Sequence, residues 1–323
     1  MTELVRKLAA ETGLSLNDVR IIMISAPVRY KVYFIPKRNG EKREIAQPAR
    51  EVKLLQRALM RTLLIRLPIH NCATAYRKGL SIADNAGPHA GIGRPLLKMD
   101  FRDFFPSIRQ YDWRAYCCEL PDFLDEEDIR LTSNLLFRRD KGSSSMRLAI
   151  GAPSSPMLSN ILLYEFDDKV SSAIAKDKVV YTRYADDLTF SAPRTGYLTG
   201  VMKTVADIIR KMKRPRLEIN SEKTVYATSK FHRSVTGLVL SNDGRVTIGR
   251  EKKRQIHAAV HHATQQRLSQ DDLQTLAGLL AHVNSVEPAF ILSLRNKYGD
   301  AVIEAIQRTV IIGARRATLE SGS

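Results

Sequence analysis

The chain has 323 residues, of which 44% are hydrophobic and 26% charged, so wholesale disorder is not expected. Its 51 Lys and Arg outnumber its 34 Asp and Glu, and the net charge of +17 favours a polyanionic partner, most simply nucleic acid, with a membrane surface as the alternative. The chain lacks a long apolar run, a signal peptide and a cysteine pattern typical of disulfides or zinc. We therefore expect a cytoplasmic protein that does not bind membranes.

The N-terminal region is predicted to form a helix and then a hairpin. Ser15 suits the cap of a helix whose buried face carries Ile21 and Ile22. Residues 30–35 have the composition of a strand, and residues 42–46 return as its partner. We therefore expect two short elements that present charged surfaces.

The sequence also predicts the turn at the tip of this hairpin and the helix after it. Asn39-Gly40 suits a tight hairpin turn, and residues 51–65 have apolar side chains at helical spacing. Residues 29–66 contain 11 Lys or Arg and 3 Glu. An ordinary solvated surface is the alternative, but an excess carried by both elements favours a surface that faces phosphates.

The middle of the chain alternates strands and helices. Residues 95–99 indicate a short buried strand that ends at Asp100. Residues 156–175 are predicted to form one apolar helix. Residues 179–184 and 188–191 have strongly strand-like compositions. This order is typical of a mixed α+β domain.

The last third begins with an amphipathic helix over residues 200–214. Residues 235–240 and 245–248 are predicted strands, joined by a turn at 242–244. From Arg250 onward the pattern is helical to the end, and no internal repeat is found.

Three Asp-Asp pairs occur, so the dipeptide alone carries little information. Residues 167–168 lie in a helical run and are expected on a solvated face, and residues 271–272 follow Ser269 at a helix start, where acids are favourable. Residues 186–187 lie between two strands without Gly, Pro or Asn to form the turn. Two acids at such a tip repel each other unless a cation neutralises them, and divalent cations prefer carboxylate oxygen.

A second acidic cluster strengthens the metal interpretation. Asp100 ends a predicted strand and Asp103 follows it. If that strand pairs beside the hairpin of Asp186 and Asp187, the acids converge. Two Mg²⁺ ions about 4 Å apart can then activate a hydroxyl and stabilise a leaving pyrophosphate. The alternative is a set of separate capping or surface acids.

Several motifs resemble those of reverse transcriptases. Residues 184–187 (Tyr-Ala-Asp-Asp) resemble the signature hairpin, and residues 100–105 the first catalytic motif. Residues 151–156 and 217–224 resemble the next two motifs in order. The resemblance implies two Mg²⁺ ions, with Mn²⁺ as an alternative, held by the catalytic residues Asp100, Asp186 and Asp187, and contacts to the deoxynucleoside triphosphate by Arg43, Phe105, Gly151 and Lys223.

Two further elements are similar to those of bacterial retron reverse transcriptases. They are Asn-Ala-Gly-Pro-His at residues 85–89 and Val-Thr-Gly at residues 235–237. The resemblance implies a structured noncoding RNA as template and primer, priming from a 2′-hydroxyl, a branched RNA–DNA product and a role in anti-phage defence with an effector protein. One departure is Ile150, where the family commonly has Gln, because Ile cannot make amide hydrogen bonds.

The C-terminal region corresponds to the family's helical thumb, which grips the duplex and the cognate RNA. Lys297-Tyr298-Gly299 resembles the retron thumb, whereas His257 and His261, one helical turn apart, are expected on a solvated face. The resemblance implies RNA contacts by Asn85, His89, Val235, Thr236, Gly237, Arg250, Lys252, Lys253 and Arg254.

The predicted fold is an α+β right-hand polymerase with fingers, a palm of antiparallel sheet plus helices, and a helical thumb. We expect an N-terminal helix and fingers at 1–94, a palm with an inserted fingers segment at 95–249, and the thumb at 250–323. The expected activity is RNA-directed DNA polymerisation. The alternatives are another bacterial reverse transcriptase of the intron or diversity-generating type, a non-catalytic RNA-binding protein and a two-metal nuclease.

Overall fold

The structure is a computed structural model and describes residues 2–37, 40–228 and 230–309. Backbone contacts divide the chain into two compact units. The large unit comprises residues 1–81 and 95–226, and the small unit comprises residues 82–94 together with the chain from 227. These boundaries differ from the three predicted domains because residues 82–94 pack with the C-terminal part of the chain. The division into fingers, palm and thumb stays a prediction.

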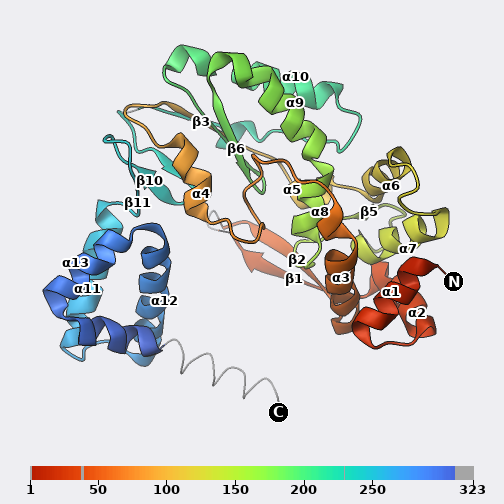
Figure 1. Cartoon of the computed structure of the whole chain (residues 1–323), viewed down its shortest axis with the longest axis horizontal. Helices are drawn as coiled ribbons and strands as arrows, with labels where there is room; N and C mark the ends of the chain where they lie inside the picture. Colours follow the sequence, from red (N-terminus) through yellow and green to blue (C-terminus); the bar gives the residue numbers. More distant parts are fainter. Residues whose placement is uncertain (1, 38–39, 229, 310–323) are drawn as a thin grey trace. The chain divides into compact units, whose positions relative to one another are not determined.

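The large unit begins with helices that pack against α3 and α7 (Figure 1). The Ser15 hydroxyl accepts a hydrogen bond from the Asp18 amide, which confirms the predicted cap. Ile22 is buried as predicted, but Ile21 is 53% exposed, because neighbouring residues on a helix point about 100° apart. The four helices are α1 (Glu3–Thr12), α2 (Leu16–Ser25), α3 (Arg50–Thr62) and α7 (Glu126–Leu136).

The predicted hairpin is confirmed as β1 (Tyr30–Pro36) paired antiparallel with β2 (Lys42–Pro48). The predicted tip residue Asn39 lies outside the described residues. The Ala46 amide of β2 donates to the Ile150 carbonyl over 2.8 Å. This bond attaches the hairpin to the loop of residues 151–154.

A four-stranded sheet forms the centre of the large unit, with strand order β6-β7-β3-β8. Its central pair runs antiparallel. Apolar side chains of these strands, including Leu97 and Phe190, pack with helices α8, α9 and α10 in one hydrophobic core. The strands are β3 (Leu96–Asp100), β6 (Val180–Tyr184), β7 (Asp187–Ser191) and β8 (Val225–Ala227), and the helices are α8 (Ser155–Leu162), α9 (Tyr164–Ile174) and α10 (Val201–Lys211).

The helix predicted over residues 156–175 is two helices. Leu163 leaves helical geometry, with φ −92° and ψ 4°, and separates α8 from α9. The amphipathic helix predicted at 200–214 is confirmed as α10, with Val201 and Val205 buried. The remaining helices and strands of the large unit are α5 (Phe104–Ser107), α6 (Gln110–Glu119), β4 (Arg138–Arg139) and β5 (Met146–Arg147).

The small unit combines a short insertion, a three-stranded sheet and a helical region (Figure 1). The single strand predicted over 235–240 is wrong: positive φ angles at Thr236 (47°) and Gly237 (81°) form a tight turn and divide it into two paired strands. The helical pattern predicted after Arg250 is confirmed up to residue 309, and residues 310–323 lie outside the described residues. The elements are α4 (Ile82–Ala86), β9 (Ser234–Val235), β10 (Leu238–Leu240), β11 (Val246–Thr247), α11 (Arg250–Thr264), α12 (Gln270–Val286) and α13 (Pro288–Tyr298).

Two predictions from composition concern the whole chain. Cys72, Cys117 and Cys118 are all free thiols. Within residues 2–37, 40–228 and 230–309, no helix combines the length and apolarity needed to cross a bilayer.

Candidate active site

The structure brings the three predicted catalytic carboxylates to one end of the central sheet. Asp100 is the last residue of β3 and Asp187 the first of β7, and the two are register partners. Asp186 lies in the two-residue turn between β6 and β7, and its carbonyl accepts a hydrogen bond from the Phe101 amide over 3.1 Å. Antiparallel pairing of β3 beside the hairpin therefore produces the convergence expected from the sequence.

The three carboxylates affect one another electrostatically. Burial, followed by the charges of Asp186 and Asp100, raises the pKa of Asp187 to about 6. Burial and the Asp100 charge also raise the pKa of Asp186. Lys223 neutralises part of this negative charge, because its ammonium lies 2.9 Å from Asp100 Oδ1. The cluster thus holds more negative charge than its own cation neutralises.

The donor chemistry fits a hard divalent cation, since all three groups are carboxylates, and burial and mutual repulsion raise the pKa values of Asp186 and Asp187. In the described parts of the chain, however, no three His, Cys, Asp or Glu side chains are grouped closely enough to hold an ion. Lys223 instead pairs with Asp100 in this conformation. A metal would therefore compete with the Lys223 ammonium for Asp100.

Of the residues predicted to contact the nucleotide, Arg43 and Lys223 lie close enough to this cluster to affect its charge. Arg43 is an exposed residue of β2, and its charge acts to lower the pKa of Asp186, against the larger effect of burial. Phe105 is partly buried with its ring centroid 5.2 Å from that of Phe104, which belongs to the core. Gly151 has φ 114°, and a Cβ there would lie 3.1 Å from the Ala46 carbonyl oxygen. Only glycine fits this approach to β2 without a shift.

The prediction for Asp167 is wrong. It was expected on a solvated helix face, but it is fully buried and forms a bidentate ion pair with Arg183 of β6. Arg183 Nη1 also donates to the carbonyl of Ala185 in the catalytic turn over 3.1 Å and to Asn160 Oδ1 over 3.0 Å. Sequence reasoning missed Arg183 and Asn160, because the partners lie on three separate elements. An arginine two residues before the turn of Ala185 and Asp186 was the available signal.

The retron-like elements lie together in the small unit. The side chains of Asn85, His89 and Val235 are buried, and burial lowers the pKa of His89 to about 3. The Thr236 hydroxyl donates to the Ile82 carbonyl over 3.3 Å, which ties the turn at 236–237 to α4. Burial favours a packing role for these side chains, and their predicted contact with RNA stays a prediction.

The basic start of α11 is partly neutralised within the chain. The Lys253 ammonium donates to the Glu287 carboxylate, which also accepts a hydrogen bond from the Thr247 hydroxyl over 2.8 Å. Arg250 and Arg254 are exposed, and Lys252 is partly exposed. Of the predicted RNA-contacting residues, these two arginines and Gly237 are exposed.

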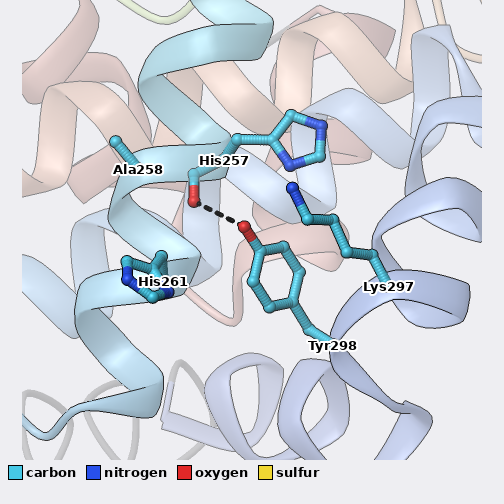
Figure 2. Close-up of a pocket in the computed structure, with 5 residues that line it drawn as sticks. All are labelled: His257, Ala258, His261, Lys297 and Tyr298. Carbon is cyan, nitrogen blue, oxygen red and sulfur yellow. Dashed lines mark hydrogen bonds between the residues drawn. The ribbon is translucent and has the colours of Figure 1, made fainter.

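A cavity of about 390 Å³ lies between α11 and α13 and is lined by His257, Ala258, His261, Lys297 and Tyr298 (Figure 2). The ring of His257 and the ammonium of Lys297 point toward one another. His257 Nδ1 is buried without a hydrogen-bond partner, and the Tyr298 hydroxyl donates to the His257 carbonyl over 3.2 Å. His257 packs against Phe290, so the predicted solvated face holds only for His261. Sequence spacing could not show this cavity, because α13 is distant in the chain.

Comparison with known proteins agrees with this geometry. Residues 35–257 match the family model for reverse transcriptase (RNA-dependent DNA polymerase). The retron Ec83 reverse transcriptase of Escherichia coli is 37% identical over 294 residues, which cover 90% of this chain and 94% of that protein. The retron Ec86 reverse transcriptase of Escherichia coli is 33% identical, with 89% and 88% covered.

A solved structure shows the same fold. The telomerase of Candida albicans, in complex with a fragment of telomeric RNA, has a TM-score of 0.50 at 12% identity, and the match covers 88% of this chain and 56% of that one. The mixture of helices with an antiparallel sheet is thus a right-hand polymerase fold. From the family match, the high coverage of its relatives and the placement of the acids, the chain is an RNA-directed DNA polymerase and belongs to the retron reverse transcriptases.

Proposed function

We propose that the chain copies a structured noncoding RNA into a short DNA, with Asp100, Asp186 and Asp187 as the catalytic residues. The observation that carries the proposal is the convergence of these three carboxylates at one sheet end, with Asp100 and Asp187 in register. Reverse transcriptases generally use divalent metal ions. Two Mg²⁺ ions held by the carboxylates would lower the pKa of the attacking hydroxyl and neutralise charge on the leaving pyrophosphate.

The surrounding residues position the triphosphate. Arg43 supplies a positive charge from β2, and Lys223, released from Asp100, supplies another beside the phosphates. The ring of Phe105 excludes a ribose 2′-hydroxyl, and the backbone at Gly151 lets the nucleotide approach β2 closely. These residues orient the reactants, which is the principal contribution of protein groups to phosphoryl transfer.

The small unit is the proposed RNA-binding part. Retron reverse transcriptases act on RNA and DNA, which fits a template and a primer. Exposed Arg250 and Arg254 lie one turn apart on α11, and the cavity beyond them places Lys297 against His257. No carboxylate lies within 4 Å of the Lys297 ammonium in the described residues. Such unbalanced positive charge suits the phosphates of A-form RNA.

The retron reading adds a specific product. We infer that priming starts from an RNA 2′-hydroxyl and yields a branched RNA–DNA molecule, with a role in anti-phage defence beside an effector protein. The similarity to retron enzymes over most of the chain supports this reading above an intron or diversity-generating enzyme.

The test is to purify the protein expressed with its flanking genomic DNA and to analyse bound nucleic acid before and after RNase. A discrete short DNA with an RNase-resistant branched nucleotide is expected. Heterogeneous RNA without DNA would contradict the retron product. The Asp187→Asn variant is expected to bind RNA and to make no DNA, and unchanged primer extension by it would overturn the catalytic assignment.

A further inference from the structure

The turn that carries Asp186 has a backbone conformation that an L-residue resists. Ala185, its first residue, has φ 58° and is buried. Both peptide carbonyls of the turn are held from outside it. The Asp186 carbonyl accepts from the Phe101 amide, and the Ala185 carbonyl accepts from Arg183 Nη1 over 3.1 Å. The second bond comes from a side chain, so it depends on the orientation of one guanidinium.

That guanidinium is fixed by its other partners. Arg183 Nε lies 2.9 Å from Asp167 Oδ1, and Nη2 lies 2.6 Å from Asp167 Oδ2. Nη1 also donates to Asn160 Oδ1 over 3.0 Å. Arg183 and Asp167 have 0% side-chain exposure. The planar guanidinium is hydrogen-bonded to Asp167 and to Asn160, so it cannot rotate without losing several hydrogen bonds.

The partners are themselves fixed by the fold. The Tyr181 hydroxyl donates to Asp167 Oδ1 over 2.8 Å, and Asn160 Nδ2 donates to the Ala75 carbonyl over 2.8 Å. The network therefore joins α8, α9 and β6 to the turn. Because α8 follows the loop of residues 151–154, the network also connects that loop to the carboxylates.

We propose that Arg183 is a positioning residue for DNA synthesis. It fixes the Ala185 peptide and thereby the direction in which the Asp186 and Asp187 carboxylates leave the turn, while Asp167 and Asn160 orient its guanidinium. A buried ion pair is often replaceable by apolar side chains without loss of stability. An apolar side chain could not donate to the Ala185 carbonyl as Arg183 does, so such a replacement would keep the packing and lose the hold on the turn. The proposal rests on the catalytic assignment of the two acids.

The main test uses the double variant Arg183→Met/Asp167→Leu, which removes both charges together. Single-turnover primer extension is measured at saturating deoxynucleotides, beside the nucleotide KM, RNA affinity and thermal unfolding. We expect a folded protein with RNA affinity within about twofold of wild type and an extension rate about 10- to 100-fold lower, since small misplacements of reacting groups have such effects. A folded double variant that extends at the wild-type rate would overturn the proposal.

A second variant decides the question if the double variant does not fold. Asn160→Ala removes one acceptor and leaves the ion pair in place, and we expect a rate about 3- to 10-fold lower with the nucleotide KM unchanged. An unchanged rate would count against the network. Arg183→Lys keeps the positive charge but lacks the planar guanidinium. It should restore less than half of the primer-extension rate that is lost without Arg183.

The matched control is Thr132→Val, which removes the buried hydrogen bond from Trp113 Nε1 to the Thr132 hydroxyl, 2.9 Å long, elsewhere in the large unit. It should lower the melting temperature and leave the extension rate unchanged. An equal loss of rate in this control would show that lost stability explains the effect, against the proposal. Asp187→Asn in the same series separates the two hypotheses, because wild-type extension by that variant would refute the catalytic assignment itself.

Discussion

Among the described residues, Arg183 in the large unit and Arg233 in the small unit have exposed fractions of 0% and 1%, and the two are held differently. Arg183 in the large unit faces the Asp167 carboxylate. Arg233 in the small unit donates to backbone carbonyls, from Nη1 to Arg94 over 2.7 Å and from Nη2 to Ser241 over 2.9 Å. No carboxylate partner of Arg233 exists in the part of the chain that the structure describes, its Nε has no partner, and burial lowers its pKa.

The difference corresponds to two tasks. A carboxylate compensates the charge of Arg183 and fixes its plane, so its remaining donors can aim at one carbonyl of the catalytic turn. Arg233 instead joins two distant segments, 82–94 and 233–242, through carbonyl dipoles alone. We infer that Arg183 positions the turn of the candidate active site, whereas Arg233 holds two segments of the small unit together.

The largest expected effect comes from breaking only one side of the ion pair. Arg183→Met leaves the Asp167 carboxylate buried and unpaired, which should lower the free energy of unfolding by about 3–5 kcal/mol. Urea unfolding of the full chain measures this loss. The double variant with Asp167→Leu should recover most of it, and equal stability of the single and double variants would contradict this account.

The corresponding change in the small unit should cost less. Arg233→Met leaves several carbonyls without a donor and lowers stability by about 1–3 kcal/mol. Hydrogen exchange should show the loss of protection concentrated in residues 82–94. Arg245→Met, in the same unit, removes an exposed pair with Asp243 and should leave exchange unchanged. Equal effects of the two substitutions would show that Arg233 does not hold the insertion.

The carboxylates on the turn that Arg183 holds give a pH-dependent prediction. The pKa of Asp187 is raised to about 6 in the folded chain. Between about pH 4 and pH 6, the metal-free folded chain therefore keeps a proton on Asp187 that the unfolded chain has lost. Its stability should therefore fall as pH rises from near 4 to near 6, and remain lower above that range.

Asp187→Asn should then stabilise the metal-free protein near neutral pH by on the order of 1 kcal/mol and have little effect near pH 4. Thermal unfolding with a chelator measures both. Added Mg²⁺ should stabilise the wild type more than the variant. A variant less stable than wild type near neutral pH would disprove the charge crowding.

The smallest expected effect concerns the cavity of the small unit. Lys297→Gln should weaken RNA binding several-fold and lower the slope of log affinity against log salt by about 1. Filter binding over a salt series measures both quantities. Lys230→Gln, an exposed lysine that does not line the cavity, is the matched control. Equal slopes for the two variants would remove Lys297 from the RNA contact.

Local sequence signals predicted the strands and the turn that carry the candidate catalytic acids. The predicted strands on either side of Asp186 form the hairpin of β6 and β7, and the predicted strand that ends at Asp100 pairs with β7, which places Asp100 beside Asp187. The cap at Ser15 and the helix start after Ser269 were also predictable, because each depends on side chains a few residues apart. A sequence pattern can predict such contacts because the residues that form them are close together in the chain.

Features that depend on distant partners were not predictable in the same way. Asp167 lies on a helix whose pattern allows a solvated face, and only the folded position of Arg183 makes it a buried ion. The turn at Thr236 was hidden because threonine rarely adopts positive φ. The grouping of residues 82–94 with the C-terminal part depends on Arg233, which lies well over a hundred residues later.

This interrupted grouping has a consequence for synthesis of the protein. About 130 residues are translated between the insertion and its partner segment, so at about 5–20 residues per second α4 is made roughly 7–26 s before its neighbours. The second part of the large unit, residues 95–226, is made in that interval. The small unit, the proposed RNA-binding part, can therefore fold only after residues 95–226 of the large unit have been made.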